Sequence, residues 1–185
     1  MENEVDMIEG CRTGDNSARK AFYDLYSKRM LAVCYRYTGD EDAAHDVLHD
    51  GFIKIFTRFN FRGECSLDTW VARIMVNQCL DYLRRNKRIN GVISSEELPD
   101  LPDEAEADAA LMGGQLSNEV LRELVTGLPD GCREVFNLFV FEEKSHKEIA
   151  ALLGIKEHSS TSQLHRAKHM LMKKIKDYRL NEERL

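Results

Sequence analysis

The stretch Ser145–Leu171, SHKEIAALLGIKEHSSTSQLHRAKHML, predicts two helices joined by a tight turn. Ile149, Ala150 and Leu153 form an apolar stripe along the first helix, with a small residue where a second helix can cross closely. Gly154 follows this stripe and supplies the chain reversal, because glycine adopts left-handed backbone conformations easily. The pattern is typical of a helix-turn-helix.

The second helix of this stretch has one apolar side and one polar side. We expect Ser159 or Ser160 to cap its start. The apolar side carries Leu164, Ala167, Leu171 and Ile175. The opposite side carries Thr161, Ser162, His165, Arg166, His169 and Lys173. A face with hydrogen-bonding and cationic groups and no acid suits a helix in the DNA major groove, although a solvated surface hairpin has the same pattern.

The composition of the 185 residues predicts an all-α protein. The apolar fraction is 43% and only three prolines interrupt the chain. Leu, Ala, Lys, Arg and Glu are abundant, whereas runs of β-branched residues are few. No apolar run approaches the roughly 18 residues of a membrane span, and the acidic start MENEVDMIEG lacks the features of a signal peptide. We therefore expect a cytoplasmic protein that does not insert into the membrane.

Cysteine and histidine spacing gives no metal motif. The five cysteines are scattered and never form a Cys-x-x-Cys pair. This pattern favours free thiols in a reducing compartment over a disulfide framework. Two histidine pairs are spaced one helical turn apart, His45 with His49 and His165 with His169. No further ligands are evident near either pair, so we expect neither a metal nor another cofactor.

The net charge of −6 arises in one segment of the chain. Residues 91–118 hold seven acids and no base, while the two flanking parts are nearly balanced. The segment Gly91–Gly114 also contains two prolines and three glycines, a linker composition. The sequence thus predicts two small helical domains, 1–90 and 116–185, joined by a flexible acidic linker, 91–115.

The first domain is expected to contain a helix over Asn16–Tyr37 and another over Ala43–Phe56. Gly39 breaks the chain between them, and Asp40 or Asp42 can cap the second helix. The core face of that helix is predicted to hold Ala44, Val47, Leu48, Gly51, Phe52, Ile55 and Phe56. Asp46, His49, Asp50 and Ile53 lie off this face, and an isoleucine among acids suits an anchor for a partner protein.

A loop, Phe59–Leu67, precedes a long helix from Asp68 to about Arg88. We expect Val71, Ile74, Met75 and Tyr82 to point inward on this helix. A separate stripe is predicted from Arg73, Asn77, Leu80 and Arg84. An asparagine between arginines, beside a loop with aromatic and glycine residues, suits nucleic-acid contact, and the alternative is an ordinary polar surface.

Three segments together resemble one protein family. They are DEDAAHDVLHDGFIKIF at 40–56, FNFRGECSLDTWVARIMVNQCLDYLRRNKR at 59–88, and LRELVTGLPDGCREVFNLFVFEEKSHKEIAALLGIKEHSSTSQLHRAKHML at 121–171. The order of W-x2-R-I-x2-N-x3-D-x-L-R-R, L-P-x4-E-V-F and E-I-A-x3-G-I is similar to that of bacterial RNA polymerase sigma factors of the extracytoplasmic-function subfamily. That subfamily keeps only conserved regions two and four.

The resemblance implies a transcription initiation factor that directs core RNA polymerase to promoters and helps to melt the −10 element. Its −10 candidates are Phe61, Arg62, Cys65, Trp70, Arg73, Asn77, Arg84 and Arg88. In the family, a base of the non-template strand is flipped into a loop pocket, and the position matching Asn77 helps to read it. Trp70 matches a family aromatic near this site, while its helical phase also allows a packing role.

The remaining implied contacts lie on the other helices. The −35 candidates in the second domain are Ser160, Thr161, Ser162, His165, Arg166 and Lys173. The candidates for docking on core polymerase are Asp46, His49, Asp50 and Ile53. The resemblance also implies an anti-sigma factor as a further partner.

Two other functions fit parts of this sequence. A helix-turn-helix repressor or response-regulator output domain leaves the loop and the Asn77 stripe without a role. An enzyme would use His45, His49, Asp46 and Asp50 as a helical acid or metal cluster. The sequence contains no nucleophile–base pair and no phosphate-cradling loop. We therefore expect no catalytic residues and no small-molecule substrate.

Overall fold

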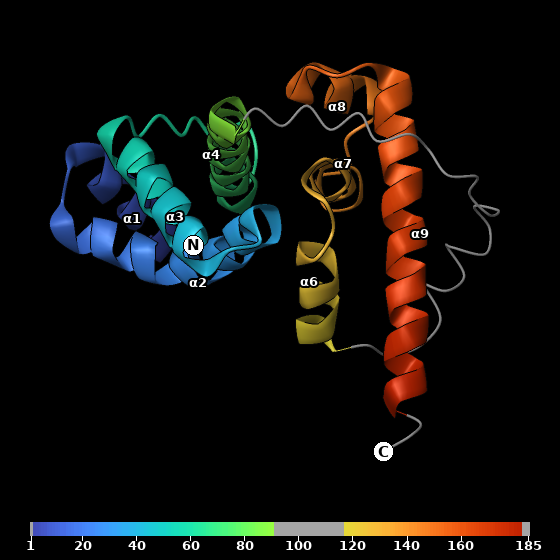
Figure 1. Cartoon of the computed structure of the whole chain (residues 1–185). Coiled ribbons are helices and arrows are strands. Elements are labelled where there is room, and N and C mark those ends of the chain that lie inside the picture. The colour runs from blue at the N-terminus through green and yellow to red at the C-terminus, as the bar shows by residue number, and fades with distance from the viewer. Residues whose placement is uncertain (1, 91–116, 183–185) are drawn as a thin grey trace. The chain divides into compact units, whose positions relative to one another are not determined.

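The computed structural model describes residues 2–90 and 117–182, and the chain forms two compact units, Met1–Ile93 and Ser94–Leu185 (Figure 1). All regular elements in these described ranges are helices, which confirms the all-α prediction. The first unit holds α1 (Glu2–Thr13), α2 (Asn16–Thr38), α3 (Glu41–Thr57) and α4 (Leu67–Asn90). The second holds α6 (Asn118–Thr126), α7 (Asp130–Val140), α8 (His146–Leu153) and α9 (Glu157–Glu182). The predicted linker at 91–115 lies outside the described residues.

The corner between α2 and α3 forms as the sequence predicts. Gly39 ends α2 in a left-handed conformation with φ 70°, which a side chain would make costly. Asp40 then caps α3, because its carboxylate accepts a hydrogen bond from the backbone N–H of Ala43 at 2.8 Å. Of the two candidate caps, Asp40 is therefore the one used.

The core of the first unit lies where α2, α3 and α4 meet. The predicted core face of α3 is buried, except that Phe56 is half-buried. An aromatic cluster fills the space between α2 and the end of α3. Phe22 of α2 lies 6.4 Å from Phe52, 5.8 Å from Phe56 and 5.7 Å from Phe59, measured between ring centroids. These edge-on contacts bury large apolar surfaces and fix the end of α3.

One prediction for α4 is wrong. Leu80 was expected on the surface stripe, but it is 1% exposed and belongs to the core. The reason is that α4 packs against both α2 and α3, so its buried arc is wider than a single stripe. Val71 and Met75 are fully buried as predicted, whereas Ile74 and Tyr82 are only half-buried.

In the second unit, α8 and the turn after it also match the sequence prediction. Ser145 and Glu148 form a capping box at the start of α8. Hydrogen bonds from the Ser145 hydroxyl and backbone N–H lower the pKa of the Glu148 carboxyl. Gly154 ends the helix at φ 68° and reverses the chain. The predicted apolar side of α9 is buried throughout, at Leu164, Ala167, Leu171 and Ile175.

The start of α9 differs from the prediction. The helix begins at Glu157, two residues before the first expected cap. The backbone N–H groups of Ser159 and Ser160 both donate to the carbonyl of Lys156, at 3.0 and 3.2 Å. Both serines therefore lie inside the first turn, and neither is the N-cap.

Leu80→Ala tests the corrected position of this side chain. We expect it to lower the free energy of unfolding of the first unit by about 2–5 kcal/mol, as for other buried leucines. The fluorescence of Trp70 during urea denaturation measures this directly, since Trp70 is the single tryptophan and lies in that unit. An unchanged unfolding midpoint would return Leu80 to the surface stripe.

Candidate nucleic-acid interface

The loop between α3 and α4, together with the start of α4, forms an open pocket of about 360 Å³. Its described lining is Asn60, Phe61, Arg62, Glu64, Cys65, Trp70 and Arg73. The structure thus brings together the predicted loop residues, Trp70 and the first arginine of α4. Asn60 and Glu64 were not predicted, because nothing in their spacing distinguishes them from ordinary loop residues.

Trp70 connects this pocket to the core. Its ring centroid lies 5.2 Å from that of Phe59 and 5.5 Å from that of Phe61. Trp70 is half-buried, so one part packs against Phe59 while it also lines the pocket. The packing role considered from the sequence is therefore confirmed, while the nucleic-acid role of Trp70 stays a prediction. A partly exposed aromatic wall beside arginines can stack a planar base and attract its phosphate.

The exposed side of α4 continues away from the pocket. Arg73, Asn77 and Arg84 are all exposed, at helical spacings of four and seven residues. Asn77 lies one turn beyond Arg73 and is not among the described residues that line the pocket. The side chain of Arg88 lies outside the described residues. The predicted stripe, without Leu80, is therefore a surface that leads from the pocket along α4.

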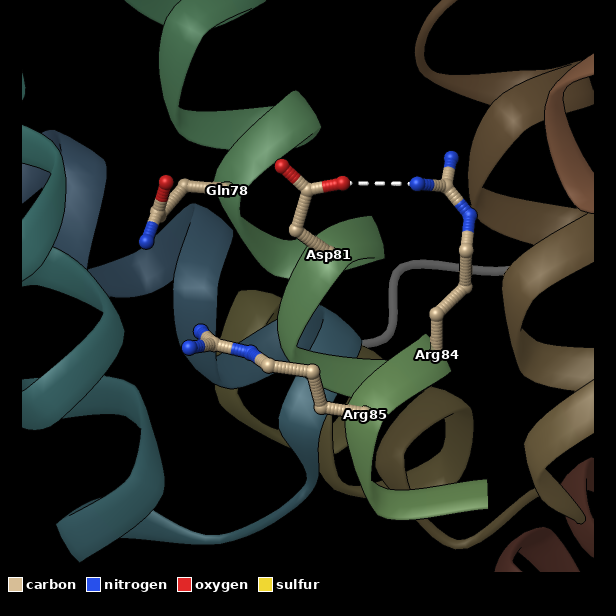
Figure 2. A pocket seen from close by; sticks show the side chains of 4 residues that line it. All are labelled: Gln78, Asp81, Arg84 and Arg85. Carbon is tan, nitrogen blue, oxygen red and sulfur yellow. Dashed lines mark hydrogen bonds and ion pairs between the residues drawn. The ribbon is translucent and has the colours of Figure 1, made fainter. Parts of the chain in front are cut away.

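A second pocket of about 420 Å³ lies further along α4. It is lined by Gln78, Asp81, Arg84 and Arg85 (Figure 2). The Arg84 guanidinium pairs with the Asp81 carboxylate at 2.6 Å, while Arg85 extends in a different direction. The ion pair holds Arg84 in one orientation but is exposed, so we expect little net stability from it.

The polymerase-docking candidates share one exposed face of α3. Asp46, His49, Asp50 and Ile53 are all exposed, and Ile53 is 52% exposed to solvent. The core face of the same helix points away from them. This surface combines acidic groups with one large apolar side chain.

The reading face of α9 is accessible at most predicted positions. Thr161 and Lys173 are exposed, while Ser162, His165 and Arg166 are partly exposed. The hydroxyl of Thr161 donates to the carbonyl of Glu157 at 3.3 Å, and that of Ser162 donates to the carbonyl of His158 at 2.9 Å. With their protons used within the helix, both hydroxyl oxygens can still accept a hydrogen bond.

Ser160 does not belong to this reading face. Its side chain is fully buried, and its Oγ is hydrogen-bonded to Nδ1 of His146 at 2.9 Å. His146 in turn stacks on Phe139, with ring centroids 4.9 Å apart. Ser160 is four residues before Leu164, in phase with the apolar side of α9, so the sequence contained the signal for its burial. The prediction that Ser160 contacts the −35 element is therefore wrong, because its side chain is buried and bonded to His146.

The described residues hold neither a cluster of metal-ligating side chains nor a helix suited to span a membrane. Within 2–90 and 117–182, no group of three or more His, Cys, Asp and Glu side chains is placed to hold a metal ion. No helix in the same ranges has the length and apolar character that crossing a membrane requires.

Comparison with known proteins identifies both units. Residues 22–89 match the family model Sigma-70 region 2, and residues 118–171 match Sigma-70, region 4. A region 2 bundle with a loop pocket, followed by a region 4 helix-turn-helix, defines a promoter-directing transcription initiation factor. The chain belongs to the extracytoplasmic-function (ECF) subfamily of bacterial RNA polymerase sigma factors.

The relatives cover almost the whole chain. It is 26% identical to the ECF RNA polymerase sigma factor SigW of Bacillus subtilis, over 92% of this chain and 95% of the relative. It is 24% identical to the RNA polymerase sigma-H factor of Pseudomonas aeruginosa, over 95% of each chain. Among solved structures, it is similar to the sigma factor RpoE of Bartonella quintana, crystallised with the anti-sigma factor NepR. That match has a TM-score of 0.50 and 21% identity, covers 85% of this chain and 96% of the other, and supports the fold.

Ser160→Ala tests the buried hydrogen bond at the start of α9. We expect the second unit to lose about 1–3 kcal/mol of stability, because His146 keeps its polar nitrogen without the partner hydroxyl. Helical circular dichroism during thermal unfolding measures the change. Thr161→Ala is the matched control, since this neighbouring hydroxyl is exposed. Equal stability of the two variants would show that the Ser160–His146 bond contributes nothing.

Proposed function

We propose that the loop pocket of the first unit captures an unstacked base of the −10 element during promoter melting. The observation that carries the proposal is the pocket itself, where Phe61 and Trp70 stand beside Arg62 and Arg73. The aromatic rings offer stacking surfaces, and the arginines supply positive charge for the single-stranded backbone. The pocket opens next to the exposed side of α4, along which the strand can continue.

The free energy gained by stacking one base in the pocket is similar in size to the cost of extracting that base from the duplex. Extracting a base from duplex DNA costs a few kcal/mol. Stacking of one base on an aromatic side chain contributes about 1–3 kcal/mol. Capture in the pocket therefore offsets much of the cost of opening, and no covalent step by this chain is needed. We accordingly propose a non-enzymatic factor.

Asn77 and the arginines of α4 have separate roles in this proposal. The Asn77 amide can both donate and accept, so it can read the polar edge of an extruded base near the pocket. Arg73, Arg84 and Arg88 contact the phosphate backbone, which carries no sequence information directly. Cys65 and Phe61 form part of the surface against which the base rests.

The second unit is proposed to read the −35 element. Its α9 enters the major groove with Thr161, Ser162, His165 and Arg166 toward the bases. Lys173, two turns further along, is placed for a phosphate. Each unit alone has a small contact surface, but both gain affinity when they are fixed on one polymerase.

The exposed face of α3 is proposed to dock on core polymerase. Asp46 and Asp50 favour a basic partner surface, and Ile53 supplies an apolar contact at its centre. We further propose that the chain acts in the cytoplasm, where polymerase is found. An anti-sigma partner is proposed by analogy with the RpoE–NepR complex.

Asn77→Ala tests the assignment to base reading. We expect normal affinity for core polymerase and an unfolding free energy within about 0.5 kcal/mol of the parent, because Asn77 is exposed and leaves no cavity. Open-complex formation should fall, or one −10 position should tolerate other bases. The control is a template whose −10 region is already melted. There the defect should persist and depend on the base present, and normal transcription of every template would refute the role.

Arg166→Ala and Lys173→Ala distinguish base contacts from phosphate contacts on α9. Arg166→Ala should weaken binding to −35 DNA by about 1–3 kcal/mol and relax specificity at one position. Lys173→Ala should weaken binding to all sequences similarly. It should also reduce the slope of log K against log salt concentration by about one, because one fewer counterion is released. Binding of holoenzyme to duplex fragments at several salt concentrations separates the two. If Arg166→Ala binds as the parent does, the reading face is misplaced.

A further inference from the structure

The hairpin of α1 and α2 is tightly constructed. A Cβ atom at Gly10 would collide with the Cβ of Ala18, so the two helices approach closely at this point. Gly14 makes the turn at φ 89°. The Asp15 carboxylate then caps α2 by accepting from the N–H of Ala18 at 2.7 Å. The backbone of this hairpin is consequently held in a defined arrangement.

Two arginines of the hairpin bind backbone carbonyls around the start of the loop. Arg19 donates from Nη2 to the carbonyl of Phe56 at 3.3 Å, and its guanidinium lies 5.7 Å from the centroid of the Phe56 ring. Arg12 donates from Nη2 to the carbonyl of Phe61 at 3.1 Å. Arg19 thus holds the carboxyl end of α3, where cations are favourable, and Arg12 holds the loop itself.

The Arg12 contact is made with a residue that lines the pocket. Phe61 lines the pocket and contacts Trp70, so the position of its backbone sets the position of one aromatic wall. Arg12 is itself oriented, because its Nη1 pairs with the Glu9 carboxylate at 2.6 Å. The carbonyl groups of a loop are not held by the repeating backbone hydrogen bonds of a helix. The hydrogen bond from Arg12 therefore restrains the position of the Phe61 carbonyl.

We propose that α1, through Arg12, positions the loop that forms the base pocket, and that Arg12 is a positioning residue for −10 recognition. This inference rests on the proposed function of the pocket. Residue 12 lies before residue 22, where the match to the region 2 family model begins. In this proposal, base recognition depends on Arg12, which lies outside the matched segment. The Arg12 side chain itself does not contact DNA.

The experiment uses holoenzyme containing the full chain and a fluorescent fork-junction DNA with a single-stranded −10 region. Each of the four bases is placed in turn at the position captured by the pocket, and binding is measured by anisotropy. The variants are Arg12→Ala, Arg12→Lys and, as a control, Lys20→Ala. Lys20 lies on the same hairpin and pairs with Asp24 at 2.6 Å. Its replacement by alanine removes one positive charge, as Arg12→Ala does.

We expect Arg12→Ala to reduce the preference for the favoured base by about threefold to tenfold, the range for loss of one hydrogen bond. Arg12→Lys, which can still donate to a carbonyl, should recover most of the preference. Lys20→Ala should match the parent. Affinity for core polymerase and unfolding followed by Trp70 should be the same for all three, since both residues are exposed. A merely structural contact would leave base preference unchanged.

The possible results distinguish the positioning role of Arg12 from the proposed capture of a base by the pocket. If Arg12→Ala keeps full base preference while Asn77→Ala loses it, the pocket reads a base but Arg12 does not position it. If Lys20→Ala loses as much preference as Arg12→Ala, the effect is one of charge and the inference is overturned. If the parent shows no base preference on this DNA, the proposed function fails and the inference fails with it.

Discussion

The packing of α4 against α2 and α3 is the constraint on which the first unit depends. One side of α4 is buried and carries Val71, Met75, Cys79 and Leu80. The burial of this side fixes the rotation of α4 about its own axis. With the rotation fixed, Arg73, Asn77 and Arg84 must face solvent. The same packing brings Trp70, in the first turn of α4, against Phe59 and Phe61 of the loop. The apolar core thus determines where the polar reading surface lies.

The division of charge is consistent with this arrangement. Acidic side chains with one isoleucine occupy the exposed face of α3, whereas arginines occupy the loop pocket and the exposed side of α4. A net charge of −6 therefore does not oppose DNA binding, because the excess acids fall in residues 91–118. Local charge, and not total charge, decides which partner each face attracts.

Much of this structure could be predicted from sequence because its signals are local. Gly39 with Asp40, and Ser145 with Glu148, are caps and turns whose chemistry acts within a few residues. Leu80 was predicted wrongly because the width of the buried arc of α4 depends on how many helices pack against it. The burial of Ser160 follows the apolar phase of α9, but its hydrogen-bond partner His146 is fourteen residues away and gives no local signal. Arg12 could not be found at all, because its carbonyl partner is forty-nine residues distant.

Cys65 offers a native probe of whether an extruded base enters the loop pocket. Cys65 lines the pocket and is partly exposed, whereas the other four cysteines are buried. The measurement is the rate of Cys65 alkylation by N-ethylmaleimide in holoenzyme, read by mass spectrometry of the Cys65 peptide. We expect slower alkylation with pre-melted −10 DNA, and recovery of the original rate when the captured nucleotide is abasic. Equal rates with the intact and the abasic strand would contradict it.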